Sequence, residues 1–129
     1  MAETTDADRR QRHHAYDCNK GCPVEAALEL IGGKWKGVAL YHLMKKPAFR
    51  FNELKRQMGE VTQRMLTKQL RELEADGLIK RKVYPVVPPK VEYSLTAKGE
   101  SLREIIMALR DWGEEMALPA HESAISKTT

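Results

Sequence analysis

Side chains that can hydrogen-bond an anion or the edge of a nucleic-acid base gather in residues 62–71. Successive residues of an α-helix are about 100° apart, so Arg64, Lys68 and Arg71 share the face opposite Leu66, with no carboxylate among them. The amino-terminal part of such a helix can enter the major groove of DNA and read base edges. We call the following set the reading face: Thr62, Gln63, Arg64, Thr67, Lys68 and Arg71. The alternative is a surface helix that only exposes Lys and Arg to solvent.

The segments around the reading face predict a helix-turn-helix. Residues 51–58 carry apolar side chains at three- and four-residue steps, and residues 59–61 form a glycine-containing turn. Thr62 has the hydroxyl of a helix N-cap, and Gly77 ends the helix that follows. The inner stripe of that helix is Leu66, Leu70 and Leu73.

After Gly77 the apolar pattern changes to period two. Residues 79–84 and 91–95 alternate in the manner of strands, and the prolines in residues 85–90 cannot continue a strand ladder. The sequence therefore predicts a hairpin with a proline-stiffened tip, which we call the wing. A wing placed after a helix-turn-helix contacts the phosphate backbone or the minor groove, and phosphate contacts add affinity without reading sequence. The cations expected to do so are Lys80, Arg81, Lys82 and Lys90, together with Arg50 in the short extended piece at residues 49–51.

Helices are also predicted on both sides of this core. Pro23 opens a helix that ends at Gly32-Gly33, and a second one runs over about residues 34–45. The second helix is expected to point Trp35, Val38, Ala39 and His42 inward. Thr96 is expected to cap one long last helix, whose apolar side is wider than a small domain needs and therefore fits a second copy of the chain. The residues expected at this dimer seam are Leu102, Ile105, Ile106, Leu109 and Trp112. The alternative is that this helix only covers its own domain.

Length, composition and charge bound the function classes. The chain has 129 residues, of which 42% are hydrophobic, enough for the core of one domain. Residues 34–90 hold 14 Lys and Arg against 5 Asp and Glu, whereas the rest of the chain holds 8 against 13, which indicates that the middle meets a polyanion. The longest apolar run, residues 38–41, is far below the roughly 20 residues that cross a bilayer, and the polar start has no secretory pattern. We expect a cytoplasmic protein with no membrane partner, built as a flexible basic arm (1–17), a domain (18–117) and a tail (118–129).

The sequence contains no convincing motif for an enzyme active site or a metal site. The segment Gly33-Lys34 lacks the other residues of a phosphate loop, because position 28 is Leu and position 35 is Trp. His13, His14, Cys18 and Cys22 are zinc-ligand types, but their spacing matches none of the usual closed sites. We expect no catalytic residues, no metal and no cofactor.

The two cysteines are the remaining chemical groups. Cys22 directly precedes Pro23 at a helix start, where partial positive charge stabilises a thiolate. Cys18 is near enough in sequence to resolve an oxidised Cys22, or it could pair across the dimer. The alternative is an inert, half-buried thiol at the dimer interface.

Several segments together resemble the HxlR family of bacterial winged-helix regulators, over about residues 18–113. The matching segments, in order, are residues 22–25 (CPVE), 31–35 (IGGKW), 49–54 (FRFNEL), 70–78 (LRELEADGL) and 84–96 (YPVVPPKVEYSLT). The resemblance implies a homodimeric, MarR-like transcription factor that dimerises through its terminal helices, with Cys22 as a sensor of oxidants, quinones or aldehydes. The expected fold is α+β and mainly α, a winged helix-turn-helix with terminal dimerisation helices. The expected function is that of a repressor on a pseudo-palindromic operator in double-stranded DNA. The alternatives are a winged domain used for protein–protein contact and a regulator that responds to a small ligand or metal.

Overall fold

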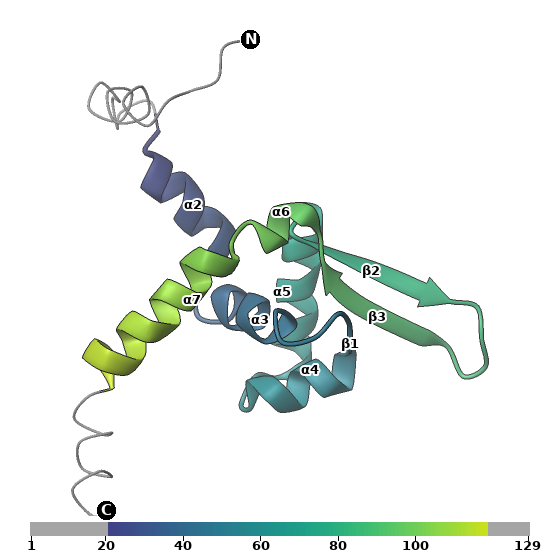
Figure 1. Cartoon of the computed structure of the whole chain (residues 1–129). Coiled ribbons are helices and arrows are strands. Elements are labelled where there is room, and N and C mark those ends of the chain that lie inside the picture. The colour runs from purple at the N-terminus through teal and green to yellow at the C-terminus, as the bar shows by residue number, and fades with distance from the viewer. Residues whose placement is uncertain (1–20, 119–129) are drawn as a thin grey trace, which may run out of the picture. The chain divides into compact units, whose positions relative to one another are not determined.

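The computed structural model of the chain describes residues 21–118 (Figure 1). By its internal contacts the chain divides between Gly32 and Gly33 into two compact units, the first of which holds one described helix, α2 (Pro23–Ile31). The second unit contains α3 (Lys36–Leu43), β1 (Phe49–Arg50), α4 (Phe51–Met58), α5 (Gln63–Ala75), β2 (Ile79–Tyr84), β3 (Lys90–Leu95), α6 (Ala97–Glu100), α7 (Arg103–Trp112) and the π-helical turn η2 (Gly113–Ala117). The predicted basic arm (1–17), Cys18 and all but the first residue of the predicted tail lie outside the described residues.

The predicted helix-turn-helix is present as α4 and α5. Leu66, Leu70 and Leu73 of α5 are all buried, which confirms the predicted inner stripe. The Thr62 hydroxyl oxygen accepts a hydrogen bond from the Met65 N–H at 3.0 Å and so caps α5 as expected. Gly59 lies between the two helices with φ +76°, a conformation that costs a glycine little and an L side chain much more.

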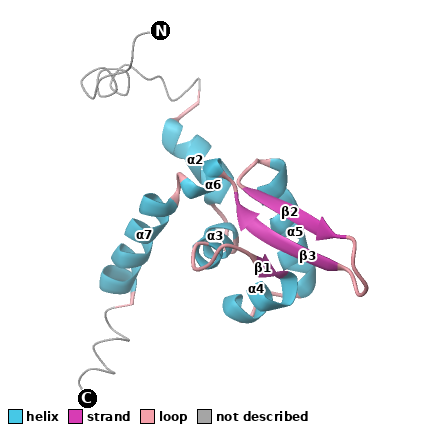
Figure 2. Ribbon diagram, turned by 45° about the vertical axis from the view of Figure 1, so that its right-hand side comes forward, coloured by secondary structure: helices cyan, strands magenta, loops and turns pink. Residues whose placement is uncertain are grey.

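The predicted wing is present as an antiparallel hairpin of β2 and β3, and β1 pairs with the other edge of β3 (Figure 2). The register places Lys82 opposite Glu92 and Glu92 opposite Arg50. Because side chains alternate between the two faces of a strand, these three residues share one polar face of the sheet. The other face carries Phe49, Ile79, Arg81, Val83, Val91, Tyr93 and Leu95.

The prediction of one long last helix is wrong, because the structure has two helices there, α6 and α7. Thr96 caps only α6, where its hydroxyl oxygen accepts from the Gly99 N–H at 3.1 Å, and the chain turns at residues 101 and 102 before α7 begins. The break lets Ile106 of α7 pack inward while α6 stays against the sheet. Arg103 and Arg110 of α7 also reach α3, since Arg103 donates to the Met44 carbonyl oxygen at 3.1 Å and Arg110 to the Tyr41 hydroxyl oxygen at 3.0 Å.

The predicted inner side of the second helix is only partly right. Ala39 is buried as expected and Trp35 and His42 are half-buried, but Val38 is 36% exposed. The residues buried with Ala39 are Leu40, Leu43 and Met44. The reason is that α3 is covered from several sides, by α4, α5, α7 and β3, so the buried sector is turned from the one predicted. Within residues 21–118 no helix combines the length and the apolar character needed to cross a bilayer.

Candidate nucleic-acid interface

The outer surface of α5 carries the reading face. Arg64, Lys68 and Arg71 are exposed, on the side of the helix opposite its buried leucines. Among residues 21–118 none of the three forms an ion pair with a carboxylate, so their charge is available to an external anion. They line a surface groove of about 900 Å³ together with Thr62, Gln63, Met65, Thr67 and Glu72.

The two threonines of the reading face are engaged within the helix. Thr62 caps α5, and the Thr67 hydroxyl donates to the Gln63 carbonyl oxygen at 2.8 Å. Gln63 and Arg64 also belong to the first turn of α5, and both are exposed.

The one carboxylate in the α5 groove is neutralised by a neighbouring helix. Nζ of Lys36 lies 2.9 Å from Oε1 of Glu72. The hydrogen bond from Lys36 lowers the pKa of Glu72, with smaller Coulombic contributions from Lys36 and Lys68. Within the part of the chain that the structure describes, the groove thus presents three cations without an ion pair and one paired carboxylate.

The wing cations do not all lie together. Lys80, Lys82 and Lys90 share the polar face of the sheet with Arg50, whereas Arg81 is on the other face. There Nε of Arg81 lies 3.8 Å from Oε1 of Glu74 on α5. Arg81 therefore links the wing to α5. The period-two pattern alone could have shown that Arg81 lies on a different face from Lys80 and Lys82.

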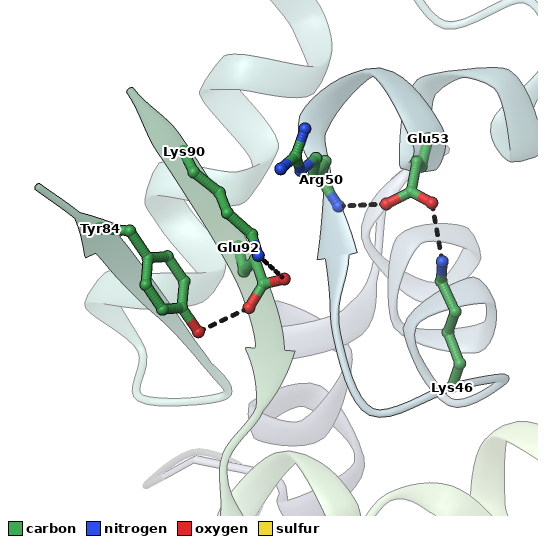
Figure 3. Close-up of polar contacts among 6 residues, drawn as sticks. All are labelled: Lys46, Arg50, Glu53, Tyr84, Lys90 and Glu92. Carbon is green, nitrogen blue, oxygen red and sulfur yellow. Dashed lines mark hydrogen bonds and ion pairs between the residues drawn. The ribbon is translucent and has the colours of Figure 1, made fainter. Parts of the chain in front are cut away.

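A tyrosine and a glutamate organise the polar face of the wing (Figure 3). The ammonium groups of Lys82 and Lys90 each lie 4.8 Å from the centre of the Tyr84 ring. The Tyr84 hydroxyl donates to Oε1 of Glu92 at 2.8 Å, and Nζ of Lys90 lies 3.5 Å from Oε2 of Glu92. The hydrogen bond from Tyr84 and the charges of Lys90 and Arg50 lower the pKa of Glu92. Sequence reasoning missed Tyr84 and Glu92 because the cross-strand register that joins them was not predicted.

The expected dimer residues of α7 divide into one inward and several outward side chains. Ile106 is 4% exposed and belongs to the core, whereas Trp112 is 63% exposed and Ile105 and Leu109 are more than half exposed. Leu102 is half-buried at the N-cap of α7. Met116 and Leu118 continue the exposed apolar series beyond the helix. In the separate unit, α2 exposes Val24 and Leu28.

Cys22 is the N-cap residue of α2, at the helix start expected from the sequence, and it is half-buried. Its predicted partner Cys18 lies outside the described residues, as do His13 and His14. In the part of the chain that the structure describes, no three His, Cys, Asp or Glu side chains are grouped so that they could hold a metal ion.

Comparison with known proteins gives one consistent result. The sequence model of a family described as HxlR-like helix-turn-helix matches residues 30–121. The chain is 56% identical over 102 residues to YdeP of Bacillus subtilis, an uncharacterized HTH-type transcriptional regulator, and the match covers 79% of both chains. The oxidized form of the redox regulator HypR is similar at a TM-score of 0.70 and 56% identity, covering 73% of this chain and 96% of HypR. The reduced form of the transcriptional regulator YodB from B. subtilis is similar at a TM-score of 0.65 and 34% identity, covering 76% of this chain and 96% of YodB.

Proposed function

This chain belongs to the HxlR-like helix-turn-helix family of transcriptional regulators, and we propose that it is a repressor that binds a pseudo-palindromic operator as a homodimer. Regulators of this fold bind DNA, and the matched relatives are regulators rather than enzymes. Its target is the duplex, so its expected location is the cytoplasm. The observation that carries the proposal is the reading face of α5, with three exposed cations that have no ion pair of their own among the described residues.

In this proposal α5 enters the major groove. Arg64 and Gln63 lie in its first turn, where recognition helices contact base edges, and Lys68 and Arg71 lie one and two turns further on. Arg or Lys bonds guanine O6 and N7, and Gln pairs with adenine. The wing cations and Arg50 contact phosphates, which position the protein without reading sequence.

Binding to duplexes at several salt concentrations tests this assignment. Each phosphate contact releases counterions, so the affinity should fall steeply with salt. We expect Arg64→Ala to weaken specific binding far more than non-specific binding, by about 1–3 kcal/mol for one lost base contact. Lys82→Ala should weaken both kinds of binding alike. Unchanged specific binding by Arg64→Ala would show that the reading face is misassigned, and salt-independent or absent duplex binding would favour a protein–protein module instead.

The dimer part of the proposal is supported by the apolar side chains that α7 leaves exposed. Exposing Ile105, Leu109 and Trp112 on one helix does not stabilise a monomer. A two-fold dimer through α7 would bury these side chains on both subunits. Two copies of α5 related by such a two-fold axis would read two half-sites.

We further propose that modification of Cys22 by an oxidant, a quinone or an aldehyde changes DNA affinity. Cys22 is placed at the amino-terminal end of α2, where partial positive charge stabilises a thiolate. HypR is named a redox regulator, and the similar YodB is known in a diamide-treated form, which supports thiol chemistry here. In this scheme Cys18 is the candidate resolving thiol.

The test is duplex binding with and without diamide or a quinone, for the wild type and for Cys22→Ser and Cys18→Ser. A response that Cys22→Ser abolishes supports the switch. A response that Cys22→Ser leaves unchanged contradicts it and favours a ligand or metal as the effector.

A further inference from the structure

We propose that Lys36 of α3 is a positioning residue for DNA binding, because its ammonium group holds the Glu72 carboxylate away from the cations of the reading face. This inference rests on the proposed function and deepens it. Lys36 belongs neither to the helix-turn-helix of α4 and α5 nor to the wing. Its role is to keep other residues available to DNA rather than to contact DNA itself.

Glu72 is a carboxylate in a place where a DNA-binding surface tolerates one poorly. It lines the α5 groove together with Arg64, Lys68 and Arg71, and its side chain is 40% exposed. A carboxylate without a partner at this place would repel the phosphates of a duplex and would compete with them for the cations. The partner that Glu72 takes within the protein therefore affects how the reading face binds DNA.

Lys68 is the reading-face cation that Glu72 would otherwise bind. The two residues are four positions apart on α5, a spacing at which oppositely charged side chains of a helix form ion pairs. The hydrogen bond from Lys36 lowers the pKa of Glu72 most, and the charge of Lys68 lowers it by less, so Lys68 is within electrostatic range. Even so, the carboxylate binds Lys36 at 2.9 Å, and Lys68 has no ion pair among residues 21–118.

The burial of Lys36 explains why Glu72 binds it rather than Lys68. The Lys36 side chain is 13% exposed, so its ammonium group has lost much of its hydration and depends on a carboxylate partner. Lys68 is exposed and loses little when it is unpaired. The same burial keeps Lys36 from serving as a phosphate contact, so we expect its effect on DNA binding to pass through Glu72.

The other glutamate of α5 is held in the same way. Glu74 is three positions after Arg71, a spacing that also permits an ion pair. Oε1 of Glu74 instead lies 3.8 Å from Nε of Arg81 on β2, and Arg71 has no ion pair among the described residues. Both glutamates of α5 are thus paired with cations from other elements, which leaves the cations of the reading face to an external anion.

The experiment compares Lys36→Met with the matched control Lys34→Met. Methionine keeps an unbranched side chain but removes the ammonium group, and Lys34 is an exposed cation with no carboxylate partner in the described part of the chain. The probes are a duplex selected by the wild type from a random-sequence pool and a scrambled duplex of equal length. Lys36→Met should lower the affinity for both duplexes roughly three- to tenfold and reduce the slope of log K against log salt by up to about 0.9, because Glu72 then neutralises Lys68. Lys34→Met should change both quantities much less.

Rescue by a second substitution separates positioning from a purely structural role. Adding Glu72→Gln to Lys36→Met removes the displaced carboxylate without restoring the ion pair, so the affinity and the salt slope should return close to those of the wild type. Lys68→Ala should cost less affinity in Lys36→Met than in the wild type, because Lys68 is already paired there. Thermal unfolding checks that each variant is folded, and Lys36→Gln removes the same charge should Lys36→Met be unstable.

Three results would overturn the role of Lys36 and leave the proposed function intact. The first is a Lys36→Met protein that binds both duplexes as tightly as the wild type does. The second is a loss of affinity that persists after Glu72→Gln is added, and the third is an equal loss in Lys34→Met. A wild type without salt-dependent duplex binding would overturn the proposed function itself.

Discussion

Nζ of Lys36 lies 2.9 Å from Oε1 of Glu72, and this ion pair joins α3 to α5 at the edge of the reading face. The Lys36 side chain is only 13% exposed, whereas that of Glu72 is 40% exposed. The pair therefore holds a carboxylate of α5 against the body of the protein and neutralises it. It contributes to stability and to the charge of the reading face.

The first prediction concerns the acid dependence of this pair. The pKa of Glu72 is lower in the folded chain than its ordinary value of about 4.3, mainly through the hydrogen bond from Lys36. Its contribution to stability is therefore present above that ordinary value and is lost as the pH falls through the folded pKa. Glu72→Gln should lower the melting temperature slightly at pH 7 and should differ less from the wild type at pH 3. A difference that is larger at pH 3 than at pH 7 would contradict the assignment.

The second prediction compares two glycines. A Cβ at Gly99 in α6 would overlap the backbone carbonyl oxygen of Leu78, whereas a Cβ at Gly113 would meet nothing nearby. Gly99→Ala should therefore lower the free energy of unfolding by about 1–3 kcal/mol or more. Gly113→Ala should be neutral or should stabilise by up to about 1 kcal/mol, because alanine favours helix. Urea unfolding of both variants measures this, and equal effects would show that α6 does not pack as closely on Leu78 as described.

The third prediction separates two neighbouring wing cations. Lys82 lies on the polar face of the sheet with Arg50 and Lys90, whereas Arg81 faces α5 and lies 3.8 Å from Glu74. Lys82→Ala should therefore reduce the slope of log K against log salt by about 0.9, the amount expected for one lost phosphate contact. Arg81→Ala should reduce it less. Titration of a scrambled duplex at four salt concentrations gives both slopes, and a larger loss from Arg81→Ala would mean that the other face of the wing meets the DNA.

Much of the fold could be predicted because it depends on local signals. The N-cap Thr62, the leucine stripe of α5 and the period-two strands were all confirmed, since each is determined by residues within a few positions of one another. The break between α6 and α7 and the buried side of α3 were not predicted. Both depend on which distant elements pack against a helix, and an apolar period does not carry that information.

The site divides in the same way. The exposure of Arg64, Lys68 and Arg71 follows from one helical period and one buried stripe. The partnership of Tyr84 with Glu92 requires the register of β2 against β3, which the alternation of residue types does not give. Sequence reasoning could therefore name the charged residues of the wing but could not identify the residues that they contact.

The last prediction concerns dimerisation through α7. Leu109 is 55% exposed, and Ile106 on the inner side of the same helix is buried, so Leu109→Glu changes the outer surface without opening the core. A two-fold dimer contains the substitution twice, once in each subunit. Losing two buried leucines should therefore weaken the free energy of dimer formation by roughly 3–6 kcal/mol, which raises the dimer dissociation constant strongly. Sedimentation equilibrium should show a dimeric wild type and a largely monomeric variant. The variant should also bind a duplex with two half-sites more weakly than the wild type does. The matched control is Val87→Glu at the exposed wing tip, which should remain dimeric. A Leu109→Glu protein that stays folded and fully dimeric would remove this surface of α7 from the interface and would leave α2, with exposed Val24 and Leu28, as the remaining candidate.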